Sequence, residues 1–154
     1  SFLIMEGRLS FFVRSLKSNN MSTGLVFGTF DGIHEGHLSF LRQAKEYTDV
    51  LIASVPSDSL VEQFKAKQPR HPYEQRVSFL LETRLVDKVV PSDSTPGEYT
   101  ILSSDTPDRI LLGYDQIDLK KSLEVYLQAH KLDIPVILLS PYKPDQFKSS
   151  LLNL

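Results

Sequence analysis

Two histidines three positions apart stand directly after an apolar run. The segment GTFDGIHEGH, residues 28–37, contains His34 and His37 with Gly36 between them, and it follows the apolar residues GLVF. An apolar run followed by a turn that contains glycine predicts the end of a buried strand and the start of a helix. Histidines at this spacing lie on one side of a helix start, so both rings can serve one ligand.

A helix start attracts anions, because its first amides have no carbonyl partners and its dipole is positive there. We expect this helix to begin at Gly36 or His37, with free backbone amides facing the preceding loop. The two rings would add hydrogen-bond donors, and Gly36 would leave room for a phosphate to approach the backbone. The segment therefore predicts a phosphate site.

A metal site and a purely structural role are the alternatives for the histidine pair. Histidines at this spacing also bind zinc, but the chain has no cysteine and no H-E-x-x-H spacing, and Asp31 and Glu35 would both have to turn inward. In the structural alternative, one histidine caps the helix and the other is an ordinary surface residue. The spacing alone leaves these alternatives open.

Other site patterns are missing from the sequence. There is no G-x-x-x-x-G-K-[ST] phosphate loop, no G-x-G-x-x-G after a strand and no G-x-S-x-G elbow. A phosphate-loop kinase, a dinucleotide oxidoreductase and a serine hydrolase therefore all lose support. A formal net charge of -2 provides no basic field for a nucleic-acid backbone, so we expect no nucleic-acid partner.

The length and composition suit one globular domain: 154 residues, 41 % hydrophobic and 23 % charged. The lack of cysteine fits a reducing compartment, and we expect a cytoplasmic protein. Charged residues interrupt residues 1–20 well short of the ~20 apolar residues of a membrane span, so no span is expected. We interpret residues 1–20 as an N-terminal extension or tag remnant and residues 21–154 as the domain.

Short apolar runs alternate with helical patterns after Met21, which is typical of βαβ units. We therefore predict an α/β fold, a Rossmann-like doubly wound parallel sheet of about five strands in a three-layer α/β/α arrangement. The expected strands are 24–30, 49–55, 86–93, 109–115 and 135–141. The expected helices are 37–47, 57–67, 72–84, a short one after a turn within 95–109, and 119–130.

Ligands of such sheets bind outside the carboxyl ends of the strands. Four of these ends carry polar or basic residues, in the segments 28–37, 57–58, 113–116 and 142–150. A basic, proline-containing stretch at 67–76 predicts a loop over the same site.

Four blocks of the sequence resemble those of a known protein family. The segment GTFDGIHEGH is similar to the HxGH signature of the nucleotidyltransferase superfamily, in its cytidylyltransferase-like branch. Three further blocks in the family's order resemble its arginine-bearing helix with the strand after it, its fourth-strand end and its closing segment, namely PYEQRVSFLLETRLVDKVV, LLGYDQ and FKSSLLNL. Together the four blocks cover roughly residues 24–152.

The resemblance implies transfer of AMP or CMP from ATP or CTP to a phosphate on a small acceptor, with release of pyrophosphate. It also implies Mg²⁺ held mainly by substrate phosphates, without a dedicated protein site, and a homodimer. The implied catalytic residues are His34, His37 and Lys67. The implied nucleotide-binding residues are Gly28, Thr29, Phe30, Asp31, Gly36, Gly113, Asp115, Ser149 and Ser150. The implied acceptor or phosphate contacts are Lys65, Arg76 and Lys148. For the two loop lysines, Lys65 and Lys67, a solvated surface position is an equal alternative.

The acceptor remains open within this resemblance. LLGYDQ and FKSS resemble the archaeal FAD synthase branch, which adenylates FMN, more than the glycerol-3-phosphate cytidylyltransferases. PYEQR and RLVDKVV fit the latter, and the heptose adenylyltransferases of lipopolysaccharide synthesis, almost as well. A non-catalytic nucleotide-binding module is an alternative of another class, because no Lys or Arg follows the closing serine pair. A metal-dependent hydrolase is a third.

Overall fold

Residues 21–142 are described by the computed structural model of this chain. The expected extension at residues 1–20 lies outside the described residues, and so do Lys148, Ser149 and Ser150. Within residues 21–142, no helix is both long enough and apolar enough to cross a bilayer.

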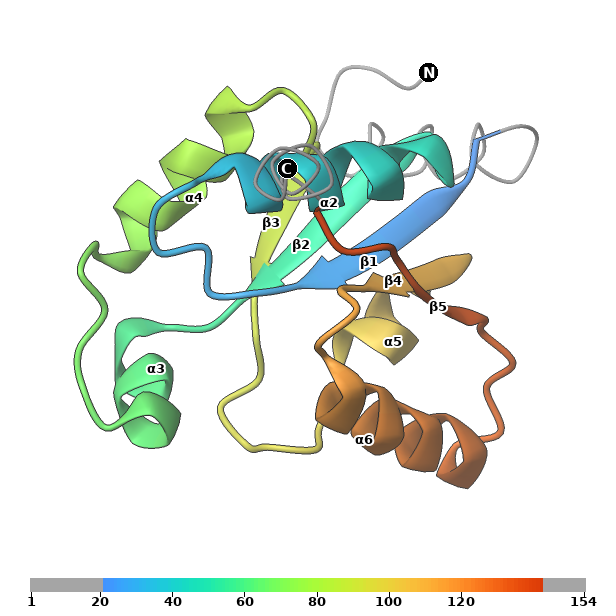
Figure 1. Ribbon diagram of the computed structural model, residues 1–154. Helices are drawn as coiled ribbons and strands as arrows, with labels where there is room; N and C mark the ends of the chain where they lie inside the picture. The colour runs from blue at the N-terminus through green and yellow to red at the C-terminus, as the bar shows by residue number, and fades with distance from the viewer. Residues whose placement is uncertain (1–20, 143–154) are drawn as a thin grey trace, which may run out of the picture.

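A parallel sheet of five strands forms the centre of the molecule (Figure 1). The strands are β1 (Thr23–Phe27), β2 (Val50–Val55), β3 (Lys88–Pro91), β4 (Arg109–Leu112) and β5 (Val136–Leu138). Their order in the sheet is β3-β2-β1-β4-β5, and every neighbouring pair is parallel. The chain therefore winds outward from β1 in one direction and then from β4 in the other, so the predicted doubly wound α/β fold is confirmed.

Helices cover both faces of this sheet. They are α2 (Glu35–Glu46), α3 (Asp58–Lys65), α4 (Tyr73–Glu82), α5 (Ile101–Ser104) and α6 (Ile117–Ala129). In Figure 1, α2 and α4 lie over one face, and α5 and α6 lie over the other. Helix α3 stands at the carboxyl edge, beside the sheet rather than flat on it.

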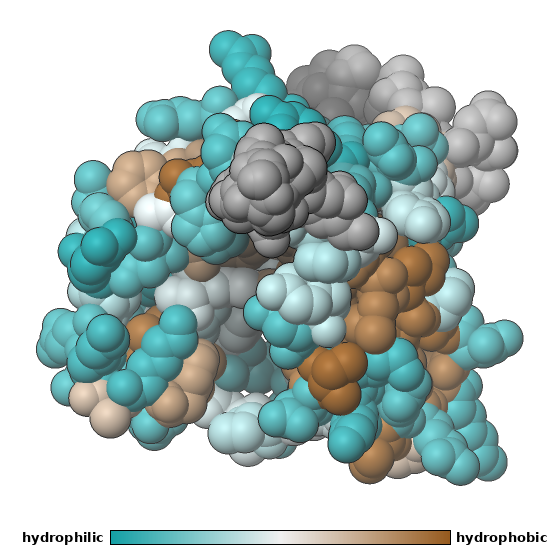
Figure 2. All heavy atoms as spheres, in the orientation of Figure 1, coloured by the Kyte–Doolittle hydropathy of each residue, from teal (hydrophilic) through white to brown (hydrophobic). Residues whose placement is uncertain are grey.

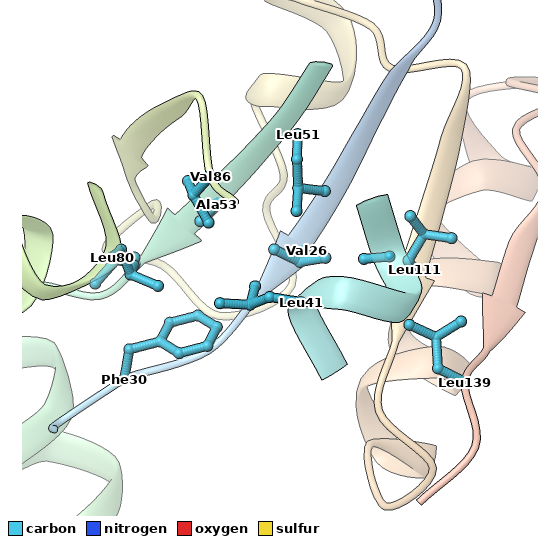
Figure 3. Packing of buried hydrophobic residues seen from close by; sticks show 11 residues of the cluster. Val26, Phe30, Leu41, Leu51, Ala53, Leu80, Val86, Leu111 and Leu139 are labelled. Carbon is cyan, nitrogen blue, oxygen red and sulfur yellow. The ribbon is translucent and has the colours of Figure 1, made fainter. Parts of the chain in front are cut away.

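Two apolar cores follow from the alternation of side chains along the strands. On one face Val26 of β1 packs with Leu41 of α2 and Leu80 of α4 (Figure 3). On the other face Leu25 of β1 packs with Leu123 of α6. All five of these side chains are fully buried. The apolar runs seen in the sequence are therefore strands that bury both faces, as parallel strands do.

The elements differ from the expected bounds mainly at their ends. Strand β1 ends at Phe27 rather than at residue 30, because the turn begins at Gly28. Helix α5 has four residues, since the expected segment 95–109 starts with turns and ends with the residue that begins β4. Helix α2 begins at Glu35, slightly before the expected Gly36 or His37.

Candidate active site at the carboxyl ends of the strands

A cleft of about 1400 Å³ opens at the carboxyl ends of the strands. Its lining comes from the turn before α2, from α3, from the segment after β3 and from the start of α6. Figure 2 shows the hollow between the α3 side and the α6 side of the molecule. The cleft includes the edge between β1 and β4, where the winding direction reverses, which is the usual ligand position in such sheets.

The size of the cleft bears on how many ligands it holds. Pockets for one small ligand have volumes of about 300–1,000 Å³. At about 1400 Å³ this cleft leaves room for two substrates side by side.

His34 and His37 cap helix α2 reciprocally. Nδ1 of His34 accepts hydrogen bonds from the amides of Gly36 (3.0 Å) and His37 (3.3 Å). Nδ1 of His37 accepts one from the amide of His34 (3.2 Å). The two rings stack with their centroids 3.8 Å apart, and both line the cleft. The arrangement is a capping box in which the two imidazoles replace the usual Ser or Thr hydroxyl and Glu carboxylate.

This capping fixes the tautomer of the two rings. A ring nitrogen that accepts an N–H bond carries no proton, so a neutral imidazole in this position bears its proton on Nε2. Burial, with the charge of the neighbouring His34 as a smaller cause, lowers the pKa of His37 to about 4. At neutral pH His37 is therefore an uncharged donor through Nε2–H.

Two expectations about the helix start are corrected by this geometry. The amides of Gly36 and His37 are not free to bind an anion, because the His34 ring accepts from both. The space beside Gly36 is filled by the same ring, since a Cβ at this position would lie 2.9 Å from Cε1 of His34. His34 thus caps the helix, as the structural alternative predicted, and the cap uses the Nδ1 atom of each ring but neither Nε2.

The ring of Phe30 packs against the ring of His37. The Phe30 side chain is 4 % exposed and belongs to the core shared by β1, α2 and α4 (Figure 3). Its ring lies 5.3 Å from that of His37, centroid to centroid. The backbone of Phe30 has φ +50°, an unusual conformation for a bulky residue. A Cβ on Gly28 would approach the Phe30 ring to 2.6 Å, so glycine is required there by packing.

Asp31 ties the histidine turn to the loop between α3 and α4. Its carboxylate accepts hydrogen bonds from the amides of Arg70 (2.6 Å) and His71 (2.8 Å) and pairs with Nδ1 of His71 (2.9 Å). Burial by itself raises the pKa of Asp31, but the bonds from Arg70 and His71 outweigh it and lower that pKa below its ordinary value. The carboxylate lines the cleft and is ionised at neutral pH.

Arg76 lies away from the position that sequence reasoning expected. Its side chain is fully buried, and it does not line the cleft. The guanidinium donates to the carbonyls of His71 (3.0 Å) and Thr29 (3.1 Å) and pairs with the carboxylate of Asp58 (2.7 Å). Its burial and its three bonds make Arg76 a positioning residue that joins the histidine turn to α3, and an acceptor contact does not agree with this placement.

The remaining predicted residues divide between the cleft and its surroundings. The cleft is lined by Gly28, Thr29, Phe30, Asp31, Gly36, Lys65, Gly113 and Asp115. Lys67, predicted as catalytic, is exposed and lies outside this lining. Of the four predicted strand-end segments, 28–37 and 113–116 line the cleft, and so does Tyr142 at the start of the fourth. Ser57 and Asp58 lie outside the lining, although their neighbours Pro56 and Leu60 belong to it.

Gln116 lies in the predicted strand-end segment 113–116, but no role was predicted for its side chain from the sequence. Its Oε1 accepts from the amide of Gly113 (2.8 Å), and its Nε2 donates to the carbonyl of Phe27 (3.1 Å). The side chain thus joins the carboxyl ends of β4 and β1 across the reversal point of the sheet. Its position two residues after the GY of LLGYDQ, directly behind a strand end, was the available signal.

The donor set of the cleft fits a divalent ion that arrives with substrate. Residues 21–142 hold no group of three or more His, Cys, Asp or Glu side chains arranged for a metal. Mg²⁺ commonly binds through one or two carboxylates together with substrate phosphates. Asp115, exposed in the turn before α6 and lining the cleft, would supply such a carboxylate.

Comparison with known proteins shows to which family the chain belongs. Residues 25–151 match the family model described as cytidylyltransferase-like. The chain belongs to this family. The HxGH nucleotidyltransferase resemblance read from the sequence is thereby confirmed, and the chain is a nucleotidyltransferase.

Its relatives include archaeal FAD synthases. The FAD synthase of Thermococcus kodakarensis is 37 % identical over 129 residues, covering 82 % of this chain and 85 % of the relative. That of Pyrococcus horikoshii is 40 % identical over 133 residues, covering 82 % and 86 %.

Solved structures agree on the fold. A lipopolysaccharide core biosynthesis protein from Thermoplasma volcanium superposes with a TM-score of 0.71 at 26 % identity, covering 80 % of this chain and all of that one. A pantoate-beta-alanine ligase from Francisella tularensis reaches 0.62 at 14 % identity, covering 100 % of this chain and 74 % of that one, and it shares the fold alone.

Proposed function

We propose that this cytidylyltransferase-like protein is an FMN adenylyltransferase, which transfers AMP from ATP to FMN and forms FAD. The observation that carries this proposal is the similarity to FAD synthases along four fifths of the chain. The two-substrate volume of the cleft supports it as well. A sugar-phosphate nucleotidyltransferase is the second candidate, favoured by the likeness to the lipopolysaccharide core biosynthesis protein.

The reaction needs no covalent enzyme intermediate. An oxygen of the FMN phosphate attacks the α-phosphorus of ATP, and the bond from that phosphorus to the oxygen bridging to the β-phosphorus breaks. Pyrophosphate leaves with the bonding electron pair. The attacking phosphate is already anionic, so catalysis is mainly positioning and stabilisation of charge on the phosphoryl oxygens.

The histidine pair supplies that stabilisation in the proposal. The Nε2–H groups of His34 and His37 are aimed by the capping bonds of their own Nδ1 atoms. Fixed donors stabilise charge at the transition state without reorganising during the reaction. Because the pKa of His37 is lowered to about 4, this donor stays in one protonation state across the neutral range.

Cations and the closing segment complete the proposed phosphate site. Lys65 lines the cleft from the end of α3 and would neutralise phosphate charge. Lys67 would reach the phosphates only if its loop moved inward. On the strength of the family resemblance, Ser149 and Ser150 would hold the β- and γ-phosphates, and Lys148 would contact the acceptor or a phosphate. Mg²⁺, bound to those phosphates, would neutralise charge on the leaving pyrophosphate. A homodimer and a cytoplasmic location belong to the same proposal.

The test is a substrate screen. The purified protein is incubated with Mg²⁺ and either ATP or CTP, against FMN, glycerol 3-phosphate, phosphopantetheine and sugar phosphates, and pyrophosphate release is measured. The proposal expects release with ATP and FMN together with FAD formation, and loss of turnover in His37→Ala. Turnover only with a sugar phosphate would support the second candidate. Nucleotide binding without turnover in any pair would overturn the enzymatic proposal.

A further inference from the structure

Helix α3 presents an aromatic ring to the cleft. Phe64 is 57 % exposed and lines the cleft, and it is the only phenylalanine among the exposed large apolar side chains of residues 21–142. A single exposed apolar residue on a protein surface needs no explanation. Phe64 differs because it lies inside the substrate cleft, on a helix that buries only Val61.

The position of this helix is fixed in spite of its few buried contacts. The hydroxyl of Ser57 caps it by accepting from the amide of Leu60 (3.2 Å). The carboxylate of Asp58, in its first turn, pairs with the fully buried Arg76. The helix is closed after Lys65 by Ala66, which takes the left-handed conformation with φ +58°. Phe64 is therefore held over the cleft by anchors at the helix start rather than by packing of its own ring.

The two walls of the cleft differ in chemistry. On the α3 side the wall contains Pro56, Leu60 and Phe64. On the α6 side it contains Gly113, Asp115 and Gln116 together with the exposed ring of Tyr114. A nucleoside carries ribose hydroxyls and ring nitrogens, which need hydrogen-bonding partners. The amide of Gly113 and the side chain of Gln116 are already bonded to each other and to the carbonyl of Phe27. The carboxylate of Asp115 offers an acceptor for a ribose hydroxyl on this wall.

The apolar wall suits a flat polycyclic ring. The isoalloxazine of FMN has three fused rings with two broad faces that stack on aromatic side chains, as nucleobases do. Lys65 follows Phe64 on the same helix and also lines the cleft, so a cation stands next to the ring platform. A phosphorylated aromatic acceptor would use both groups.

We propose that Phe64 is the platform on which the isoalloxazine of the acceptor stacks, and that it sets the preference for FMN over acceptors without a ring system. This inference rests on the proposed function. The α3 wall binds the acceptor, the α6 wall binds the nucleoside, and the histidine pair lies where the two phosphate groups meet.

The test compares steady-state kinetics of wild type with Phe64→Ala, Phe64→Tyr and Tyr114→Ala. Tyr114 is a matched aromatic, 55 % exposed, on the α6 wall. In Phe64→Ala the KM for FMN rises about tenfold, as expected for the loss of one stacking ring, while kcat and the KM for ATP stay within about twofold. Phe64→Tyr keeps the KM for FMN near wild type, because the aromatic face remains.

The control removes an aromatic ring elsewhere. Tyr47, 41 % exposed at the end of α2, lies outside the cleft lining, so Tyr47→Ala keeps wild-type KM values. If wild type forms FAD but Phe64→Ala has an unchanged KM for FMN, the inference is wrong and the proposed function stands. If Phe64→Ala raised the KM for ATP and Tyr114→Ala raised the KM for FMN, the α3 wall would bind the nucleoside and the α6 wall the acceptor. That result would also overturn the inference. If wild type forms no FAD, the proposed function itself fails.

Discussion

Gly36→Ala separates the two explanations for the glycine of the HxGH segment. The added Cβ would lie 2.9 Å from Cε1 and 3.1 Å from Nδ1 of His34, so the capping ring has to shift. Losing a helix cap costs about 0.5–2 kcal/mol. Replacing Gly by Ala within a helix stabilises it by about 0.5–1 kcal/mol. The two effects oppose each other, and the free energy of unfolding falls by at most about 1.5 kcal/mol.

Activity in this variant should fall as well. The ring that moves carries one of the two Nε2–H donors, and opening the 2.9 Å contact to an ordinary distance of 3.4 Å moves it by about 0.5 Å. A displacement of about 1 Å at a reacting centre costs about 10²-fold in rate, so we expect kcat for FAD formation to fall about tenfold. Glu46→Ala, at the exposed end of the same helix, is the control and keeps wild-type values in both assays.

The pattern of kinetic change identifies the cause. If Gly36 were reserved for a phosphate, Ala would raise the KM for ATP and leave the ring pair in place, with Nε2–H tautomers visible in the ¹⁵N imidazole spectrum. If the glycine makes room for the ring, that spectrum changes and kcat falls. A Gly36→Ala variant with wild-type kcat would refute the reasoning about the capping ring.

Three further predictions follow from the same contacts. Asp58→Asn lowers the free energy of unfolding by about 1–3 kcal/mol, because the buried Arg76 loses its charged partner; an unchanged urea midpoint would contradict this. The lowered pKa of His37 makes the unfolded state bind more protons between pH 6.5 and about 4. The contribution of His37 to the free energy of unfolding is therefore complete above pH 6.5 and is lost as the pH falls toward 4. In this range the free energy of unfolding should fall more steeply with pH in wild type than in His37→Gln. Chelation of divalent ions abolishes turnover and added Mg²⁺ restores it, so activity in excess chelator would count against a metal carried by the phosphates.

The sequence predicts the fold and the place of the site because both depend on periodicity and on strand ends. Apolar runs alternating with helical patterns are sufficient to specify a parallel sheet, and a parallel sheet gathers its strand ends at one edge. The capping of α2 by its own histidines was not predictable, since it depends on rotamers that the spacing does not specify. The family resemblance implied an acceptor or phosphate contact for Arg76. Its burial was not predictable from the sequence, because charged side chains rarely lie buried without partners and those of Arg76 come from three separate segments.

The partners of Arg76 link the two parts of the site, the histidine turn before α2 and the start of helix α3. Arg76 bonds to the carbonyl of Thr29 in the histidine turn and to the carboxylate of Asp58 at the start of α3, and Asp31 bonds to the loop between α3 and α4. A shift of α3 therefore disturbs the turn that aims the imidazoles. Phe64→Ala removes a contact without moving the helix, so it changes the KM for FMN alone. Asp58→Asn loosens the helix start itself, so it should raise that KM and lower kcat together. The difference between these two variants measures how far acceptor binding and phosphate positioning depend on the same buried cation.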